Sequence, residues 1–156
     1  MHLHLVFIGK TAFPELETGL GRYLDRLRFY IPAQIHVVKT QKISPKAGEE
    51  AVKEKEAERV LKLLGKRDFL VIWDQRGKHL DSLGFARLLD QFRSNGISEL
   101  WMLIGGHLGV SQRLLERADC VLSLSKMTFP HDLARLMVME QLYRAFTILK
   151  GEPYHK

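Results

Sequence analysis

Cysteine is almost absent from this 156-residue chain, which holds a single one, Cys120, inside the apolar run CVLSL. One cysteine cannot build an intramolecular disulfide framework, so the sequence favours a reducing compartment, and we expect the cytoplasm. Because its neighbours are apolar, we interpret Cys120 as a small buried hydrophobic residue rather than a nucleophile.

Long apolar runs are also missing, since none approaches the roughly 20 residues that cross a bilayer. The first ten residues, MHLHLVFIGK, lack both a basic region and a small-residue cleavage site, so no signal peptide is expected. The sequence has no zinc-finger spacing, no internal repeat and no low-complexity segment. His2 and His4 could in principle bind a metal, but we interpret them as the solvated face of a strand, and no metal is expected.

The nucleotide-binding fingerprints are absent as well. In GGHLG, Gly106 and Gly109 fit the last two positions of G-x-G-x-x-G, but Ile104 occupies the first. No phosphate loop ending in Gly-Lys-Ser/Thr occurs, so neither a nicotinamide nor an ATP site is indicated. Two adjacent glycines after an apolar run favour a plain tight turn, although glycine there also lets a ligand approach the backbone.

The composition is that of a globular protein, with 46% hydrophobic and 27% charged residues, and we expect one domain over residues 1–156. The net charge is +6. Such a charge suggests a polyanionic partner, nucleic acid first, or serves only to keep the surface hydrated. Because the basic residues are dispersed, charge alone locates no site.

Hydrophobic periodicity predicts a mostly parallel α/β sheet flanked by helices. The expected strands are 2–8, 34–39, 68–73, 99–104 and 120–124. The expected helices are 14–28, 49–64, one capped by Asp81 or Ser82 and running to 94, a short one capped by Ser111, and 131–149. Residues 40–48 form the one linker-like stretch.

Ligands of open parallel sheets bind at the carboxyl ends of the strands. That rule selects three loops: DQRGK after Trp73, GGHLG after Ile104, and SKMTFPH at 125–131. The third could simply be a capped approach to the last helix, with Thr128 or a neighbour as the cap and Pro130 in the first turn.

The last expected helix is apolar in almost every direction, so it must be buried on all sides. A monomer of this size has too small an interior to bury all sides of a C-terminal helix. In a homodimer the partner subunit would cover the remaining side. Glu140 and Arg144 are four residues apart and form either a plain intrahelical ion pair or a buried pair facing a ligand. The tail GEPYHK either frays or folds back as a lid.

Four motifs carry a resemblance to a known family: LHLVFIGK at the start, LIGGHLG, LSLSKMTFPHDLARLMVMEQLYRA and PYHK. In these motifs the chain resembles the RlmH family of SPOUT-class RNA methyltransferases. The resemblance covers the whole chain. It implies an α/β fold with a deep trefoil knot in the C-terminal half, and an obligate homodimer. It also implies methyl transfer from S-adenosylmethionine to N3 of a pseudouridine in 23S rRNA of the assembled ribosome.

The resemblance also implies roles for individual residues. The cofactor-binding positions correspond to Trp73, Gly105, Leu124, Ser125, Lys126, Met127, Thr128 and Phe129. Many relatives have an aliphatic residue in place of Trp73, and some have a small or acidic pair in place of His107-Leu108.

Four residues are candidates for the chemistry. Arg144 would stabilise the developing oxyanion or hold a phosphate, and His155 or Tyr154 would contact the base and take its proton. His131 would shape the cofactor loop.

Two other functions compete with this one. A SPOUT enzyme could modify a tRNA nucleotide instead, because fold does not fix substrate, and activity on isolated tRNA would favour that function. A non-catalytic protein that silences the ribosome would keep the basic surface but would not bind S-adenosylmethionine.

Overall fold

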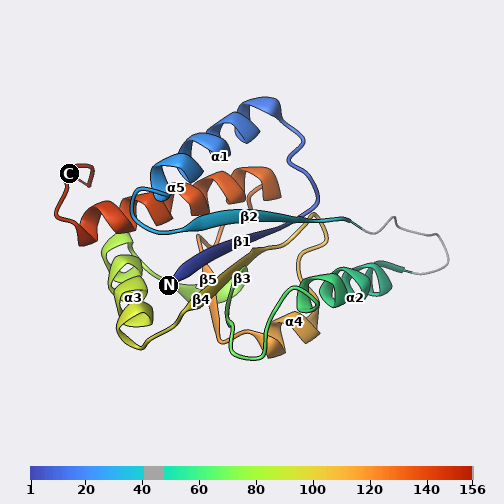
Figure 1. The fold of residues 1–156 in the computed structure, drawn as a ribbon. Coiled ribbons are helices and arrows are strands. Elements are labelled where there is room, and N and C mark those ends of the chain that lie inside the picture. The colour runs from blue at the N-terminus through green and yellow to red at the C-terminus, as the bar shows by residue number, and fades with distance from the viewer. Residues whose placement is uncertain (41–47, 156) are drawn as a thin grey trace.

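The computed structural model describes residues 1–40 and 48–155, which form a five-stranded parallel sheet in the order β2-β1-β4-β3-β5 (Figure 1). The elements are β1 (His2–Ile8), α1 (Pro14–Leu27), β2 (Ala33–Val38), α2 (Gly48–Leu61), β3 (Phe69–His79), α3 (Ser82–Ser94), β4 (Glu99–Ile104), α4 (Gln112–Arg117), β5 (Cys120–Ser123) and α5 (His131–Leu149). The expected linker at 40–48 lies almost wholly outside the described residues.

The α/β fold class and the order of elements are confirmed, with most boundaries within one or two residues of expectation. The largest shift at a helix end is in α2, which ends three residues before the expected Leu64. Two helix caps follow the sequence signals: the Asp81 carboxylate accepts a hydrogen bond from Gly84 N at 2.6 Å, and Ser111 Oγ accepts one from Leu114 N at 3.3 Å. The trefoil knot stays a prediction.

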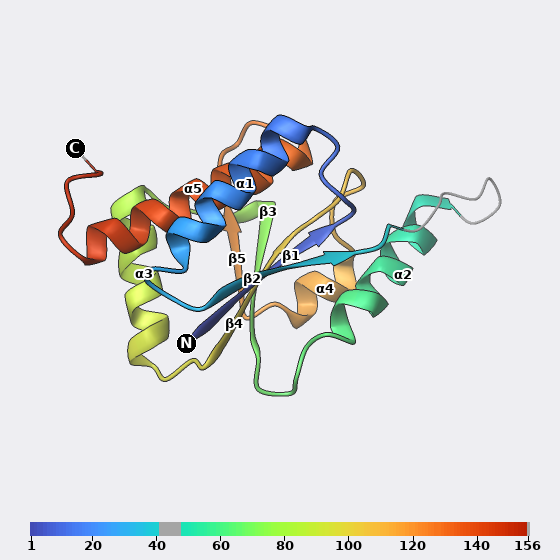
Figure 2. The ribbon, with the colours of Figure 1, turned by 45° about the horizontal axis from the view of Figure 1, so that its top comes forward.

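The sheet separates two layers of helices. Helices α1, α3 and α5 cover one face, and α2 and α4 cover the other (Figures 1 and 2). Strand β1, which lies inside the sheet between β2 and β4, shows how the alternation of side chains builds both cores: Leu3, Leu5 and Phe7 enter the first and Val6 and Ile8 the second.

The interpretation of His4 as a solvated residue is wrong. Its side chain is buried: Nε2 lies 2.6 Å from a Glu99 carboxylate oxygen, Nδ1 lies 3.0 Å from His36 Nε2, and the ring stacks on Trp101 at 4.1 Å. The cause is the strand order, which places β1 between β2 and β4. His2 is exposed, as expected. No group of three or more His, Cys, Asp or Glu side chains within 1–40 and 48–155 is arranged to hold a metal ion.

The stretch DQRGK is not a loop after the third strand, because β3 continues through it to His79. The pairing of β3 with β5 shifts register between Trp73 and Lys78, as a bulged strand does. Gly77 makes this possible: a Cβ there would lie 2.5 Å from the carbonyl carbon of Leu122. Only glycine lets the two backbones approach this closely.

Helix α5 is buried within one chain along part of its surface: eight of its 19 residues are buried, and most of the others are partly exposed. It lies between α1 and α3 on the sheet (Figure 2). Val138, Met139, Leu142 and Ala145 are fully buried, while Leu133 is 36% exposed. The helix pattern therefore does not by itself require a partner subunit.

The start of α5 also differs from expectation. Pro130 is the N-cap residue rather than a member of the first turn, and no side chain caps the helix, so Thr128 does not act as the cap. In place of a cap, a buried ion pair fixes this end. The Asp132 carboxylate accepts a hydrogen bond from Ala12 N at 2.9 Å and another from Arg135 Nη1 at 2.9 Å.

Arg135 is fully buried and joins α5 to the carboxyl end of β1. Its Nη2 donates to the Ile8 carbonyl oxygen at 2.6 Å, its Nη1 also reaches Thr11 Oγ1 at 3.2 Å, and its guanidinium lies over the Phe7 ring at 5.1 Å. Burial lowers the pKa of the guanidinium, and the Asp132 charge opposes that shift.

No helix within the described residues is both long and apolar enough to cross a membrane.

We predict that Asp132→Ala lowers the free energy of unfolding by about 3–5 kcal/mol, because it leaves the Arg135 charge buried and uncompensated. The matched control is Asp25→Ala, which breaks an exposed Asp–Arg pair of the same i,i+3 spacing with Arg28. Urea denaturation measures both variants. Equal stability of the two would contradict the account.

Candidate active site

The middle of β3, the loops after β4 and β5, and the start of α5 line a cavity of about 690 Å³ at the carboxyl edge of the sheet. This size falls in the range of roughly 300–1,000 Å³ that is typical of small-molecule sites. These segments meet because β3, β4 and β5 are adjacent and parallel, and Trp73 is in register with Ile104 on one side and Leu122 on the other. The cavity lies where the sheet topology predicts a ligand.

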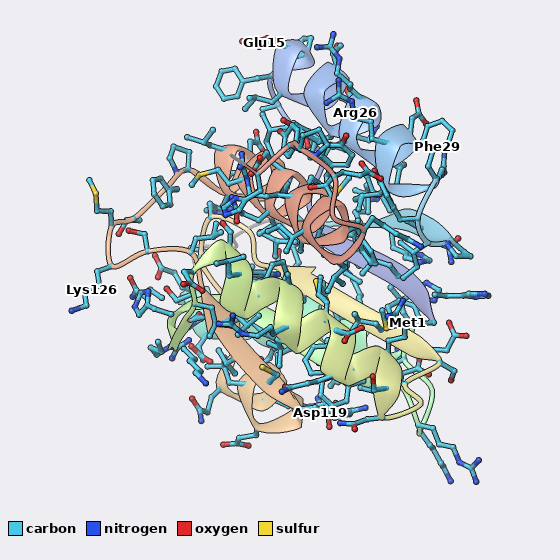
Figure 3. All side chains as sticks on the ribbon, turned by 90° about the vertical axis from the view of Figure 1, so that its left-hand side faces the viewer. Met1, Glu15, Arg26, Phe29, Asp119 and Lys126 are labelled. Carbon is cyan, nitrogen blue, oxygen red and sulfur yellow. The ribbon has the colours of Figure 1, made fainter. Side chains whose placement is uncertain are left out.

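The structure brings together seven of the eight expected cofactor-binding residues. Those that line the cavity are Trp73, Gly105, Leu124, Ser125, Met127, Thr128 and Phe129. The eighth, Lys126, is exposed, does not line the cavity, and projects away from the protein (Figure 3). Met127 is 73% exposed although it touches the cavity, so residues 126 and 127 form its outer rim.

The loop GGHLG is the tight turn that its glycines predict, and it also forms a wall of the cavity. Gly109 N donates to the Gly106 carbonyl oxygen at 3.0 Å and closes the turn. A Cβ at Gly105 would lie 3.1 Å from Val110 Cγ1, so a larger residue would press on the turn or fill the cavity. The turn and the ligand-binding interpretations are therefore compatible.

Trp73 separates the main cavity from a second one of about 350 Å³, which extends between β3, α3 and α5. Ser123 and Leu124 also line both cavities. The indole ring packs edge-on against Phe85 at 5.3 Å. Its Nε1 is buried and has no hydrogen-bond partner among the described residues. A buried donor without a partner is costly, and an acceptor atom on a bound ligand would satisfy it.

Charged residues also line the cavity wall. Arg76 binds the Asp74 carboxylate through Nε at 2.7 Å and Nη2 at 3.0 Å, and this contact lowers the pKa of Asp74. Both residues belong to the stretch interpreted as a loop, so their position was expected but their mutual pairing was not. Lys53 of α2 also lines the cavity, and nothing in its sequence neighbourhood signals that position.

His131 is the first residue of α5 and lines the cavity. Its Nε2 lies 3.2 Å from the Asp132 carboxylate. Burial is the main cause that lowers the pKa of His131; the Asp132 charge raises it, and Arg135 and His107 lower it further. The imidazole is therefore neutral at pH 7 and contributes no positive charge to the cavity.

Arg144, Tyr154 and His155 gather around Glu140 at the other end of α5. The Glu140 Oε1 atom accepts from Arg144 Nη2 at 2.6 Å and from the Tyr154 hydroxyl at 3.1 Å. The Arg144 guanidinium lies over the Tyr154 ring at 4.8 Å, and its Nη1 lies 3.4 Å from His155 Nδ1. The tail therefore folds back onto the helix and does not fray, but it is not a lid over the cavity of its own chain.

The four expected catalytic residues thus lie in two groups. Along α5, thirteen residues separate His131 from Arg144, which corresponds to about 20 Å at 1.5 Å per residue. The loop that enters α5 and the tail that leaves it stand at opposite ends of the helix (Figure 2). Within one chain, the tail residues do not reach the cavity.

Comparison with known proteins identifies the family. The family model described as "Predicted SPOUT methyltransferase" matches residues 1–155. The chain belongs to the SPOUT methyltransferase family. Relatives named Ribosomal RNA large subunit methyltransferase H match it over its full length and theirs: that of Syntrophobacter fumaroxidans is 60% identical and that of Halothermothrix orenii 40% identical.

A solved structure supports the fold. The crystal structure of a probable methyltransferase from Bordetella pertussis Tohama I superposes with a TM-score of 0.59 at 7% identity, and the match covers 93% of this chain and 94% of that one. SPOUT methyltransferases use S-adenosylmethionine as the methyl donor. The cavity volume, the apolar wall and the unsatisfied Trp73 donor all fit a ligand of that kind.

We predict that His131 contributes stability that depends on pH. Because its folded-state pKa lies below the unfolded value of about 6.5, the contribution is fully present above pH 6.5 and is lost as the pH falls toward the folded pKa. The measurement is the free energy of unfolding of wild type minus that of His131→Gln between pH 5 and 8. The same difference for the exposed control His79→Gln should be flatter, and identical profiles would contradict the prediction.

Proposed function

We propose that the protein transfers a methyl group from S-adenosylmethionine to N3 of a pseudouridine in 23S rRNA, within the assembled ribosome. The observation that carries methyl transfer is the cavity that β3 and the loops after β4 and β5 form in a chain of the SPOUT family. The names of the full-length relatives support large-subunit rRNA as the substrate. The net charge of +6 supports a polyanionic partner.

The proposed cofactor site is the main cavity. S-adenosylmethionine bound there would supply an electrophilic methyl group on its sulfonium. Gly105 would allow close approach of the backbone, Trp73 would donate from its indole Nε1, and residues 124–129 would offer hydroxyl and main-chain groups. Because Lys126 points away from the cavity, we assign it to the rim, where its ammonium would contact an RNA phosphate.

We further propose that the active protein is a homodimer in which each cavity is completed by the tail of the partner subunit. Support comes from the separation of the two residue groups by about 20 Å along α5. In a two-fold dimer with antiparallel α5 helices, the end of one helix would lie beside the start of the other. Each dimer would then contain two equivalent sites.

The arrangement of Arg144, Tyr154 and His155 around Glu140 supports a division of chemical roles. N3 of a uracil-like ring carries a proton near neutrality, and negative charge spreads onto the adjacent carbonyl oxygens as that proton leaves. Arg144 would stabilise that charge. Burial first, and then contacts with Tyr23 and Glu140, raise the pKa of Tyr154, so its phenol stays protonated and suits hydrogen-bond donation. We therefore assign proton removal to His155.

The primary test is incubation with methyl-labelled S-adenosylmethionine and ribosomes that lack the modification. We expect label in large-subunit rRNA of the assembled ribosome and none in naked rRNA or tRNA. Label in tRNA would move the substrate and keep the family. No label in any RNA, from a protein that binds S-adenosylmethionine, would overturn the proposed reaction.

We predict complementation between two inactive variants if the sites are shared between subunits. Gly105→Leu would block the cavity and Arg144→Ala would disable the tail, each reducing turnover by at least about 10²-fold. Mixed heterodimers would contain one site with both defects and one site with none, so a scrambled mixture would recover about a quarter of wild-type activity. Recovery of none would place each complete site within one chain.

Ribosome binding should weaken steeply with salt, because phosphate contacts release counterions. We expect the logarithm of the binding constant to fall linearly with the logarithm of salt concentration, measured by co-sedimentation. Lys126→Ala should reduce the slope by about 1, as the loss of one phosphate contact would. An unchanged slope would remove Lys126 from the RNA interface.

A further inference from the structure

A hydrogen bond joins the segment after α1 to the tail. The hydroxyl of Tyr30, which follows α1, donates to a carboxylate oxygen of Glu152 at 2.6 Å. Glu152 precedes the proposed catalytic residue Tyr154 by two positions. This bond joins segments 122 residues apart in sequence and holds the tail against the end of α1.

Aromatic contacts also connect the Tyr30 ring to Tyr154 in the tail. It stacks on Phe146 at 6.0 Å and meets the edge of Tyr143 at 6.0 Å. Tyr143 in turn meets Tyr154 edge-on at 4.8 Å. These geometries are the favourable offset and edge-to-face arrangements of aromatic pairs. Burial and the Glu152 contact raise the pKa of Tyr30, so its hydroxyl remains a donor at neutral pH.

A chain end that has left its helix frays unless other contacts hold it. The Glu152 amide donates to the Thr147 carbonyl oxygen at 2.9 Å, which turns the tail back at the end of α5. Beyond that turn, side-chain hydrogen bonds on two sides of the tail hold it in position. Glu140 and Arg144 hold Tyr154 and His155 on one side, and Tyr30 holds Glu152 on the other.

We propose that Tyr30 and Glu152 form a latch that fixes the tail so that Tyr154 and His155 stay beside Arg144. Both are positioning residues, since they act on turnover through the tail and not by contact with a substrate. The effect on turnover rests on the proposed function, whereas the effect on tail order does not.

Two conservative variants and their combination test the latch in the full-length chain. Tyr30→Phe removes the hydroxyl and keeps the stacked ring, and Glu152→Gln removes the carboxylate charge and keeps the side-chain size. Glu17→Gln, on the exposed part of α1, is the matched control for the loss of one negative charge. The measurements are hydrogen exchange of the Glu152 amide, kcat and KM on ribosomes, and the dissociation constant for S-adenosylmethionine.

We expect either latch variant to speed Glu152 amide exchange and to lower kcat by roughly three- to tenfold, the loss of about one hydrogen bond. The dissociation constant for S-adenosylmethionine should not change, because the proposed function assigns the cofactor to the cavity residues and the tail to the RNA base. The double variant should be no worse than either single one, since both remove the same bond. Glu17→Gln should match wild type in every measurement.

Wild-type exchange and wild-type kcat in both latch variants would overturn the proposal. A parallel loss of S-adenosylmethionine binding and thermal stability would also overturn it, because the bond would then support the fold as a whole. If the wild-type chain fails to methylate ribosomes, the proposed function falls, and the exchange rate alone decides whether the latch exists.

Discussion

The buried ion pair between Asp132 and Arg135 is the constraint on which the site depends. Two ionised groups leave water at a cost of several kcal/mol each, and this pair offsets that cost through its mutual contact and through the bonds of both Arg135 terminal nitrogens, although Arg135 Nε has no hydrogen-bond partner among the described residues. Here those bonds tie the carboxyl end of β1 and the segment after it to the start of α5. The loop at 124–130 ends at that helix, so the pair also fixes where the loop closes over the cavity.

Helix α5 then divides the proposed functional residues between its two ends. Its start carries His131 and the cavity, and its end carries Arg144 and the returning tail. A rigid helix of this length holds the two groups apart, so one chain cannot bring them together by bending. This geometry, and not the apolar surface of the helix, is the stronger physical reason to expect a dimer. It also explains why the tail needs to be held in place.

Much of the fold could be predicted because periodicity and capping signals are local. Asp81 and Ser111 cap their helices as the sequence indicates. Features that depend on strand order could not be predicted: His4 is buried because β1 lies between β2 and β4, and Gly77 is needed because β3 and β5 approach closely. The position of the cavity could be predicted, because ligands of parallel sheets bind at the carboxyl ends of the strands. The contact of Tyr30 with Glu152 could not, since no local pattern links them.

Titration calorimetry with S-adenosylmethionine tests most directly whether the two ends of α5 have separate roles. The account predicts one site per chain, lost in Gly105→Leu and retained with unchanged affinity in Arg144→Ala. Binding that survives in Gly105→Leu and disappears in Arg144→Ala would contradict it, because the cofactor would then be held by the tail cluster and not by the cavity at the edge of the sheet.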